Sequence, residues 1–161
     1  MEQVLPPKTR DGAGFELTRV CQFTVFLENR VGRLHALVRV MEEAGLKLWA
    51  ISIEESAETS LVRLICGLPE GARSVLKREG FAFSESDVLI VPLSVKTSQP
   101  IGSVCATVLT GELNIHYAYP MLASPRGPAL VLYVDDCTLA AKLLIKKGFM
   151  LVAENELKPT N

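Results

Sequence analysis

The chain has 161 residues, of which 48% are hydrophobic and 22% charged, and its formal net charge is −1. This length fits one ordinary domain or two small ones, and the composition provides enough apolar surface for a folded core. A near-neutral chain without a lysine- and arginine-rich cluster lacks the electrostatic footprint of nucleic-acid-binding proteins. No apolar run is long enough to span a membrane. For these two reasons we expect neither nucleic acid nor a membrane as a partner.

The distribution of cysteine and histidine argues against a metal site. No two cysteines have the C-x-x-C spacing, and only two histidines occur in the chain. We therefore expect no metal and no cofactor, and we interpret the cysteines as buried free thiols of a cytoplasmic protein. Residues 1–17 lack the apolar segment of a signal peptide and are expected to form a disordered or loosely attached leader.

The first half of the chain has the pattern of strand, helix, strand, strand, helix and strand. Apolar residues alternate along the predicted strands, recur at helical spacing in the predicted helices, and give way to glycine at the helix ends. A polar turn at 55–58 joins two of the strands as a hairpin, and polar residues 84–87 are expected to interrupt the last one. These elements are expected at 18–27, 31–44, 46–54, 59–67, 69–79 and 81–93.

The same pattern recurs about 70 residues later. Leu76 to Phe81 resembles Leu144 to Phe149, and Gly32 corresponds to Gly102. The chain therefore divides into a first unit at 18–87, a second unit at 88–157 and a frayed tail at 158–161. The second set of elements is expected at 88–95, 101–110, 113–119, 129–134, 136–147 and 149–153.

The loop from Glu28 to Leu34 carries the functional signal of the sequence, because it joins a strand to a helix. Asn29 is expected to cap the helix, and Gly32 leaves the first turn open to an outside molecule. Free N–H groups at a helix start suit a small anion such as a carboxylate. The alternative is that Asn29 and Gly32 only close a turn, and that Arg30 and Arg33 are ordinary solvated charges.

With the motif N-x-x-G-x-L in this loop, each half of the chain resembles an ACT domain. The resemblance covers about residues 18–157 and rests on Phe26 to Leu34, with a weaker counterpart at Gln99 to Val104. The family's usual proline before the glycine is replaced by Val31 and Ile101. The resemblance implies an α+β fold of two ferredoxin-like βαββαβ units, with antiparallel sheets and helices on one face.

The resemblance also implies that a free amino acid binds at these loops, at a seam between domains or subunits. The loop N–H groups would hold its carboxylate, and nearby strand residues would form the pocket wall for its side chain. His116 is a weaker candidate, since an ordinary half-exposed strand residue is the better explanation for it. The expected binding residues are Glu28, Asn29, Arg30, Val31, Gly32, Arg33, Leu34, Leu48, Ala50, Ile51, Ile101, Gly102, Ser103 and His116.

Two functions follow from these expectations, and both are non-enzymatic. The first is an amino-acid-sensing regulatory protein that forms a homodimer. The alternative is a regulatory small subunit that docks on an amino-acid biosynthetic enzyme such as acetolactate synthase. No nucleophile–base pair is nominated by the sequence, which makes an enzyme the weakest interpretation. The face formed by Leu113, Ile115, Tyr117 and Tyr119 is expected to lie under helices.

Overall fold

The computed structural model describes residues 19–93 and 98–159, and its elements follow the predicted order. The leader predicted at 1–17 lies outside the described residues, as do the last two residues of the tail. The first half contains β1 (Val20–Glu28), α2 (Arg33–Glu43), β2 (Leu48–Glu55), β3 (Thr59–Cys66), α3 (Pro69–Arg78) and β4 (Ala82–Pro92). The second half contains α4 (Pro100–Leu109), β5 (Ile115–Pro120), β6 (Ala129–Val134), α5 (Cys137–Lys147) and the 3-10 helix η1 (Glu154–Leu157).

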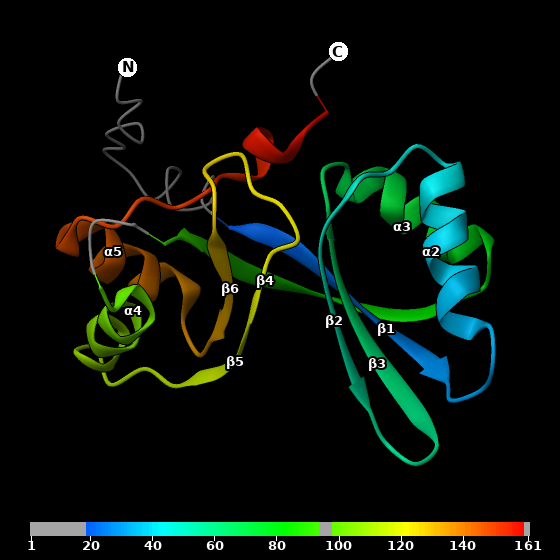
Figure 1. The fold of residues 1–161 in the computed structure, drawn as a ribbon, viewed down its shortest axis with the longest axis horizontal. Coiled ribbons are helices and arrows are strands. Elements are labelled where there is room, and N and C mark those ends of the chain that lie inside the picture. The colour runs from blue at the N-terminus through cyan, green and yellow to red at the C-terminus, as the bar shows by residue number, and fades with distance from the viewer. Residues whose placement is uncertain (1–18, 94–97, 160–161) are drawn as a thin grey trace.

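A six-stranded antiparallel sheet in the order β2-β3-β1-β4-β6-β5 runs through the described part of the chain (Figure 1). Strand β4 belongs to both units, because it pairs with β1 through Ala82–Val88 and with β6 through Leu89–Pro92. The polar residues 84–87 were expected to interrupt this strand, and that expectation is wrong: all four pair with β1. Strand β4 changes its pairing partner between Val88 and Leu89. The division of the chain into two domains at 87/88 stays a prediction.

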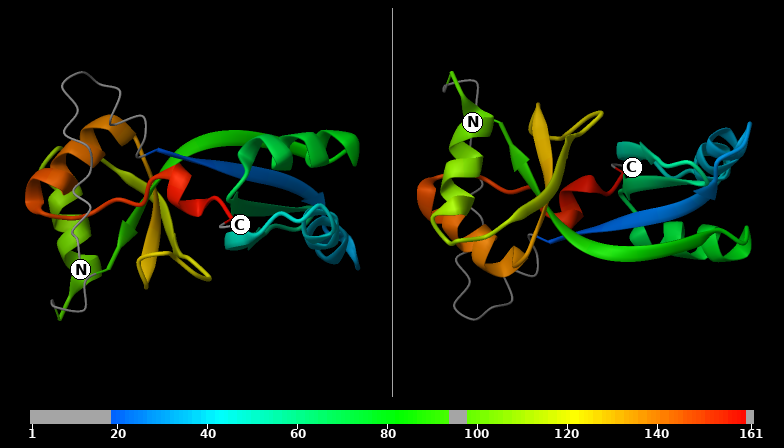
Figure 2. Two further views of the ribbon diagram at one scale, coloured as in Figure 1. Left: turned by 90° about the horizontal axis from the view of Figure 1, so that it is seen from above. Right: turned by 90° about the horizontal axis from the view of Figure 1, so that it is seen from below.

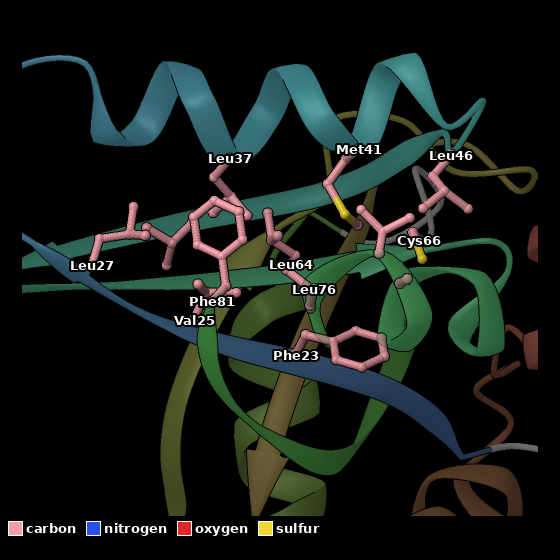
Figure 3. Close-up of a cluster of buried hydrophobic side chains, with 13 residues drawn as sticks. Phe23, Val25, Leu27, Leu37, Met41, Leu46, Leu64, Cys66, Leu76 and Phe81 are labelled. Carbon is pink, nitrogen blue, oxygen red and sulfur yellow. The ribbon is translucent and has the colours of Figure 1, made fainter. Parts of the chain in front are cut away.

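Each unit has its own core between its helices and one face of the sheet. In the first unit, Leu37 and Met41 of α2 point onto strand residues such as Phe23 and Leu64 (Figure 3). In the second unit, α4 and α5 cover Leu89 and the even-numbered residues of β6. The helices thus cover one face of each half of the sheet, which confirms the predicted ferredoxin-like arrangement.

A third core lies where the helix-free faces of the two units meet. It contains Trp49 and Ile65 from the first unit, Val131 from the second, and even-numbered residues of the shared strand β4. Figure 2 shows the C-terminal segment entering this junction beside β2. There the Trp49 indole Nε1–H donates to the carbonyl oxygen of Leu157 at 2.8 Å. The two units are therefore joined by buried surface as well as by one strand.

The aromatic residues of β5 lie in this third core, which contradicts the expected position under the helices. Leu113 and Ile115 do pack against the core beneath α4 and α5. The strand register then shifts between Ile115 and Tyr117, and Tyr117 and Tyr119 contact the core between the units instead. A register shift of this kind moves the following side chains to the other face of a sheet, and nothing in the apolar alternation signals it.

Two further expectations are corrected by the C-terminal region and the thiols. Residues 149–153 do not form the expected strand: Val152 N–H donates to the Ile90 carbonyl oxygen, and the chain then turns into η1. The Glu154 carboxylate accepts from the Cys21 backbone N–H at 3.0 Å, so a side chain takes the place of a ladder partner there. The four cysteines are free, yet only Cys66 is buried and Cys105 is exposed.

Candidate ligand-binding site

The loop that follows β1 borders a small open hollow of about 220 Å³. We call it the loop hollow. Its walls come from the end of β1, the start of α2, and the two strands of the β2–β3 hairpin. The lining residues are Leu27, Glu28, Asn29, Arg30, Arg33, Leu34, Ile53, Glu55, Ser60 and Val62. Since all of them belong to the first unit, the loop hollow is not at the junction between the two units of the chain.

Asn29 does not cap the helix, which corrects the expectation from the sequence. The helix starts four residues later, at Arg33, and its N-cap is Gly32. The Asn29 side-chain amide instead donates to Glu55 Oε1 at 2.9 Å and to the Ser56 carbonyl oxygen at 3.3 Å. Its backbone N–H donates to the Glu58 carbonyl oxygen at 3.2 Å. Asn29 therefore ties the loop to the β2–β3 hairpin and fixes one wall of the hollow.

The start of α2 presents an open backbone. Gly32 has a φ of +87°, a conformation that residues with a side chain seldom adopt, and a Cβ placed there would meet nothing within 4 Å. No side chain caps the helix. Within the described residues, no acceptor contacts the backbone N–H groups of Leu34 and His35. These N–H groups and the positive end of the helix dipole together suit an anion.

The two arginines of the loop have different surroundings. Arg30 Nε lies 3.1 Å from a Glu28 carboxylate oxygen, and both side chains are well exposed, so this pair is a solvated surface contact. The Arg33 guanidinium lies over the Phe81 ring, 5.3 Å from its centroid. Among the described residues, Arg33 forms no ion pair and its Nε has no hydrogen-bond partner. Arg33 is thus the cation of the loop hollow that an incoming carboxylate can engage.

The apolar part of the hollow differs from the predicted wall. Ile53 is 52% exposed and Leu34 is 37% exposed, above a floor that includes buried Leu27 and Val62. The predicted wall residues lie elsewhere: Leu48 and Ile51 pack at the edge of the first core, and Ala50 is buried between the units. Leu48 pairs with Cys66 at the far end of the hairpin, whereas Glu55 pairs with Ser60 beside the loop.

The second predicted loop is not an equivalent site. Helix α4 begins at Pro100, so Gly102 lies inside the helix, and the Ser103 N–H already donates to the Gln99 carbonyl oxygen. Ile101 and Gly102 are exposed and Ser103 borders a different hollow, between α4 and α5. His116 Nε2 lies 2.5 Å from Asp135 Oδ1 on the surface of the second unit. The structure does not bring these residues together with Glu28–Leu34.

Five residues that line the loop hollow were not predicted from the sequence: Leu27, Ile53, Glu55, Ser60 and Val62. The available signal was the hairpin turn at 55–58, because it places Glu55 opposite Ser60 and next to the end of β1. Within the described residues, no group of three or more histidine, cysteine, aspartate or glutamate side chains could hold a metal ion. No helix among these residues is both long enough and apolar enough to cross a membrane.

Comparison with known proteins agrees with this fold. Protein BT0572 from Bacteroides thetaiotaomicron is 24% identical, with a TM-score of 0.81 over 90% of this chain and 99% of that chain. The regulatory subunit of aspartate kinase from Thermus flavus is 12% identical, with a TM-score of 0.56 over 80% of this chain and 92% of that one. The ligand-free subunit from Thermus thermophilus is 10% identical, with a TM-score of 0.54 and the same coverages.

No curated protein sequence matches the chain. A family profile described as an ACT domain pair, however, matches residues 18–160, which include every described element. The repeat and the two helix layers are the features that such a pair predicts. This chain belongs to the ACT domain pair family.

Proposed function

We propose that this chain is a non-enzymatic regulatory protein that senses an amino acid in the loop hollow. At the level of the family, ACT domains are regulatory modules that bind amino acids. The observation that carries the proposal for this chain is the open start of α2. Its free N–H groups lie beside Arg33, the loop cation without an ion-pair partner in the described chain. Together these donors favour a carboxylate.

The remaining groups of the hollow match the other parts of an α-amino acid. The Glu55 carboxylate and the Asn29 side-chain oxygen are acceptors for the ammonium group. Ile53 and Leu34 offer exposed apolar surface for the side chain. A volume of about 220 Å³ leaves room for a side chain of moderate size. We therefore propose an amino acid with an aliphatic side chain as the ligand.

The lining of the hollow supports binding over catalysis. Ser60 is the one hydroxyl-bearing side chain among the lining residues, and none of them is a histidine, a lysine or a cysteine. A nucleophile needs a base within hydrogen-bond reach. The two lining carboxylates, Glu28 and Glu55, have an arginine and an asparagine as their partners. These contacts build a polar rim that suits recognition.

We also propose that the protein is a homodimer and that the second copy covers the loop hollow. Val31 is fully exposed beside the hollow, and Ile53 and Phe26 add exposed apolar surface on the same unit. Exposed apolar surface of this kind is typical of a surface that another chain covers. Light scattering after size exclusion is expected to give twice the mass of one chain. A monomer, with and without the ligand, would contradict this part of the proposal.

Thermal denaturation in the presence of each of the twenty amino acids tests the sensor function. A ligand at 100 times its dissociation constant stabilises the folded state by about 2.7 kcal/mol, which raises Tm by about 5–10 °C for a protein of this size. We expect such a shift with one or a few aliphatic amino acids. If none of the twenty shifts Tm, the sensor function is refuted.

Variants of the hollow separate the binding site from general stability. Arg33→Met and Asn29→Ala are expected to weaken binding about tenfold or more, because each removes or misplaces a group that holds one end of the ligand. Gly32→Val places a side chain over the open N–H groups and should abolish binding. Arg78→Met, which removes an exposed arginine paired with Glu79 on α3, is the matched control and should bind normally.

A second candidate function is regulation of a partner enzyme as a docked subunit. The fold shared with regulatory subunits of aspartate kinase is consistent with this role. A specific observation also favours it: helix α4 carries no charged residue, yet part of it is exposed. Docking and amino-acid sensing use different ends of the molecule and are compatible with each other.

A further inference from the structure

Helix α4 carries no charge on any side of its circumference, since its sequence from Pro100 to Leu109 contains no charged residue. Val104 and Val108 are buried against the second core, as expected for the inner face. The outer face carries Ile101, which is 52% exposed, and Leu109, which is 69% exposed, with exposed Cys105 between them. The spacing of four residues aligns these three side chains as a stripe about 12 Å long.

The first unit provides an internal comparison, because the two units share one fold. Helix α2 carries two arginines and two glutamates, and α3 carries one glutamate and three basic residues. Their outer faces are therefore the charged faces of ordinary surface helices. A helix that is apolar on all sides is normally covered on all sides. The α4–α5 layer lies at the opposite end of the molecule from α2 and α3 (Figure 1), and the described chain leaves its outer face uncovered.

A groove of about 490 Å³ lies between α4 and α5. We call it the α4–α5 groove. Two of the three hydroxyl groups in its wall already donate a hydrogen bond: Thr107 to the Ser103 carbonyl oxygen and Thr110 to the Thr107 carbonyl oxygen. The groove thus offers apolar and small side chains more than free donors. It is lined by Ser103, Ala106, Thr107, Thr110, Leu143, Lys146 and Lys147.

One rim of the groove is basic. Helix α5 carries Lys142, Lys146 and Lys147 and no acidic residue. Basic residues in the last turn of a helix interact favourably with the helix dipole, which accounts for the position of Lys146 and Lys147. The matching helix of the first unit differs: Arg78 pairs with Glu79, and Arg73 pairs with Glu70 and Glu85. Within the described residues, Lys146 and Lys147 form no such ion pair.

We propose that the α4–α5 groove docks a partner protein through a short apolar segment that carries carboxylates. The groove wall, which includes Ala106 and Leu143, accepts the apolar side chains, and Lys146 and Lys147 engage the carboxylates. The length of α4 suits about three turns of a helix. This inference rests on the second candidate function and is independent of ligand binding in the loop hollow.

The charge and shape of the groove disfavour two other occupants, a second copy of the chain and a membrane surface. A second copy seated symmetrically on the same groove would bring the lysine rims of both copies together, which costs free energy. A membrane surface is flat, and proteins that bind one insert protruding aromatic or large apolar side chains. The wall here is concave and built from serine, alanine and threonine. A partner with complementary charge is therefore the occupant that these residues fit.

Fluorescence anisotropy with a labelled amphipathic helical peptide of leucine, alanine and glutamate tests the proposal on the full-length protein. A twin peptide with lysine in place of glutamate is the charge control. We expect the glutamate peptide to bind at least about tenfold more tightly than its twin, and its binding to weaken as salt is raised. Amide chemical shifts should change along residues 100–111 and 137–148.

Paired charge-reversal variants locate the binding surface. Lys146→Glu with Lys147→Glu should reduce affinity for the glutamate peptide at least about tenfold, and Ala106→Glu in the groove wall should do the same. The matched control is Lys77→Glu with Arg78→Glu, in the last turn of α3, and it should leave the affinity unchanged. Circular dichroism verifies that each variant is folded. Tm shifts with amino acids should persist in all of them.

Several results would overturn the proposal. Equal binding of both peptides, chemical-shift changes outside α4 and α5, or equal losses in the test and control pairs would each refute it. A dimer that Ala106→Glu converts to a monomer would assign the groove to a second copy. Tighter binding to phosphatidylserine vesicles than to the peptide, lost in the same lysine variants, would assign it to a membrane.

Discussion

At the scale of single residues, the buried junction between the units depends on one polar side chain. Gln22 has no exposed surface. Its Nε2 donates to the Tyr117 hydroxyl oxygen, and its Oε1 accepts from the Tyr119 hydroxyl, both at 2.6 Å. The Arg63 guanidinium lies over the Tyr117 ring, 3.9 Å from its centroid. A buried polar group that is fully paired specifies how two surfaces fit together.

Gln22→Leu should lower the free energy of unfolding by about 2–3 kcal/mol, because the buried Tyr119 hydroxyl and the half-buried Tyr117 hydroxyl lose their partner. Urea denaturation measures the loss. The same substitution made in a Tyr117→Phe, Tyr119→Phe background should cost about 1 kcal/mol or less, since no unpaired hydroxyl remains. Equal losses of unfolding free energy in both backgrounds would mean that the hydrogen bonds of the Gln22 amide make no specific contribution to stability.

The reactivity of Cys21 is a second prediction at this scale. Burial, followed by the hydrogen bond of the thiol to Glu85, raises the pKa of Cys21 to about 12. Only the thiolate reacts, so Cys21 should resist iodoacetamide at pH 8 while exposed Cys105 is alkylated first. Mass spectrometry of the time course checks the order. Because the folded-state pKa lies above the unfolded value, the folded state is expected to lose stability as the pH rises above about 9.

At the scale of elements, the two loops that align in sequence differ in structure. In the first unit, Gly32 is the N-cap of α2 and has a positive φ. In the second unit, Gly102 lies in the first turn of α4, where a side chain would meet nothing within 4 Å. The repeated glycine therefore has a conformational role in one copy and none in the other.

Substitution by alanine should have opposite effects at these two glycines. Gly32→Ala should destabilise the protein by about 1 kcal/mol, because a residue with a Cβ is strained at this φ. Gly102→Ala should stabilise it by about 0.5–1 kcal/mol, because alanine loses less conformational freedom in a helix. Chemical denaturation of both variants distinguishes the signs, and the same sign at both positions would contradict the structural difference.

At the scale of the whole molecule, the shared strand and the third core predict that the two units unfold together. Calorimetry should show one transition whose calorimetric and van't Hoff enthalpies agree. The C-terminal segment takes part in this coupling. A Cβ at Gly67 would lie 1.9 Å from the Leu157 carbonyl oxygen, the acceptor of the Trp49 indole.

Gly67→Ala is therefore expected to displace η1 and to lower Tm by several degrees. Hydrogen exchange should show the loss of protection both at Val152 and in β4. Gly102→Ala in the first turn of α4 is a control for a glycine whose Cβ would meet no neighbour and whose φ is not positive. Two separated transitions in the unmodified protein would show that the units fold independently.

Much of the fold was predictable because it depends on local patterns. The period of the apolar residues located the helices and most strands, and the repeat implied two ferredoxin-like units. The hollow was predictable in part: five of the seven residues Glu28–Leu34 line it, whereas β2 contributes Ile53 and Glu55 rather than the expected Leu48, Ala50 and Ile51. The register of a hairpin depends on turn geometry and bulges. The alternation of apolar residues looks the same at both ends of a strand, so it does not show which end lies beside the loop.

The sequence by itself determined the elements, their order and the loop with an open helix start, because each depends on residues close together in the chain. The tertiary structure alone decided that β4 serves both units and that Tyr117 and Tyr119 face the junction. It also decided that Asn29 holds the hairpin and that α4 presents an uncovered apolar face. These features depend on contacts between residues far apart in the chain, which no local pattern records.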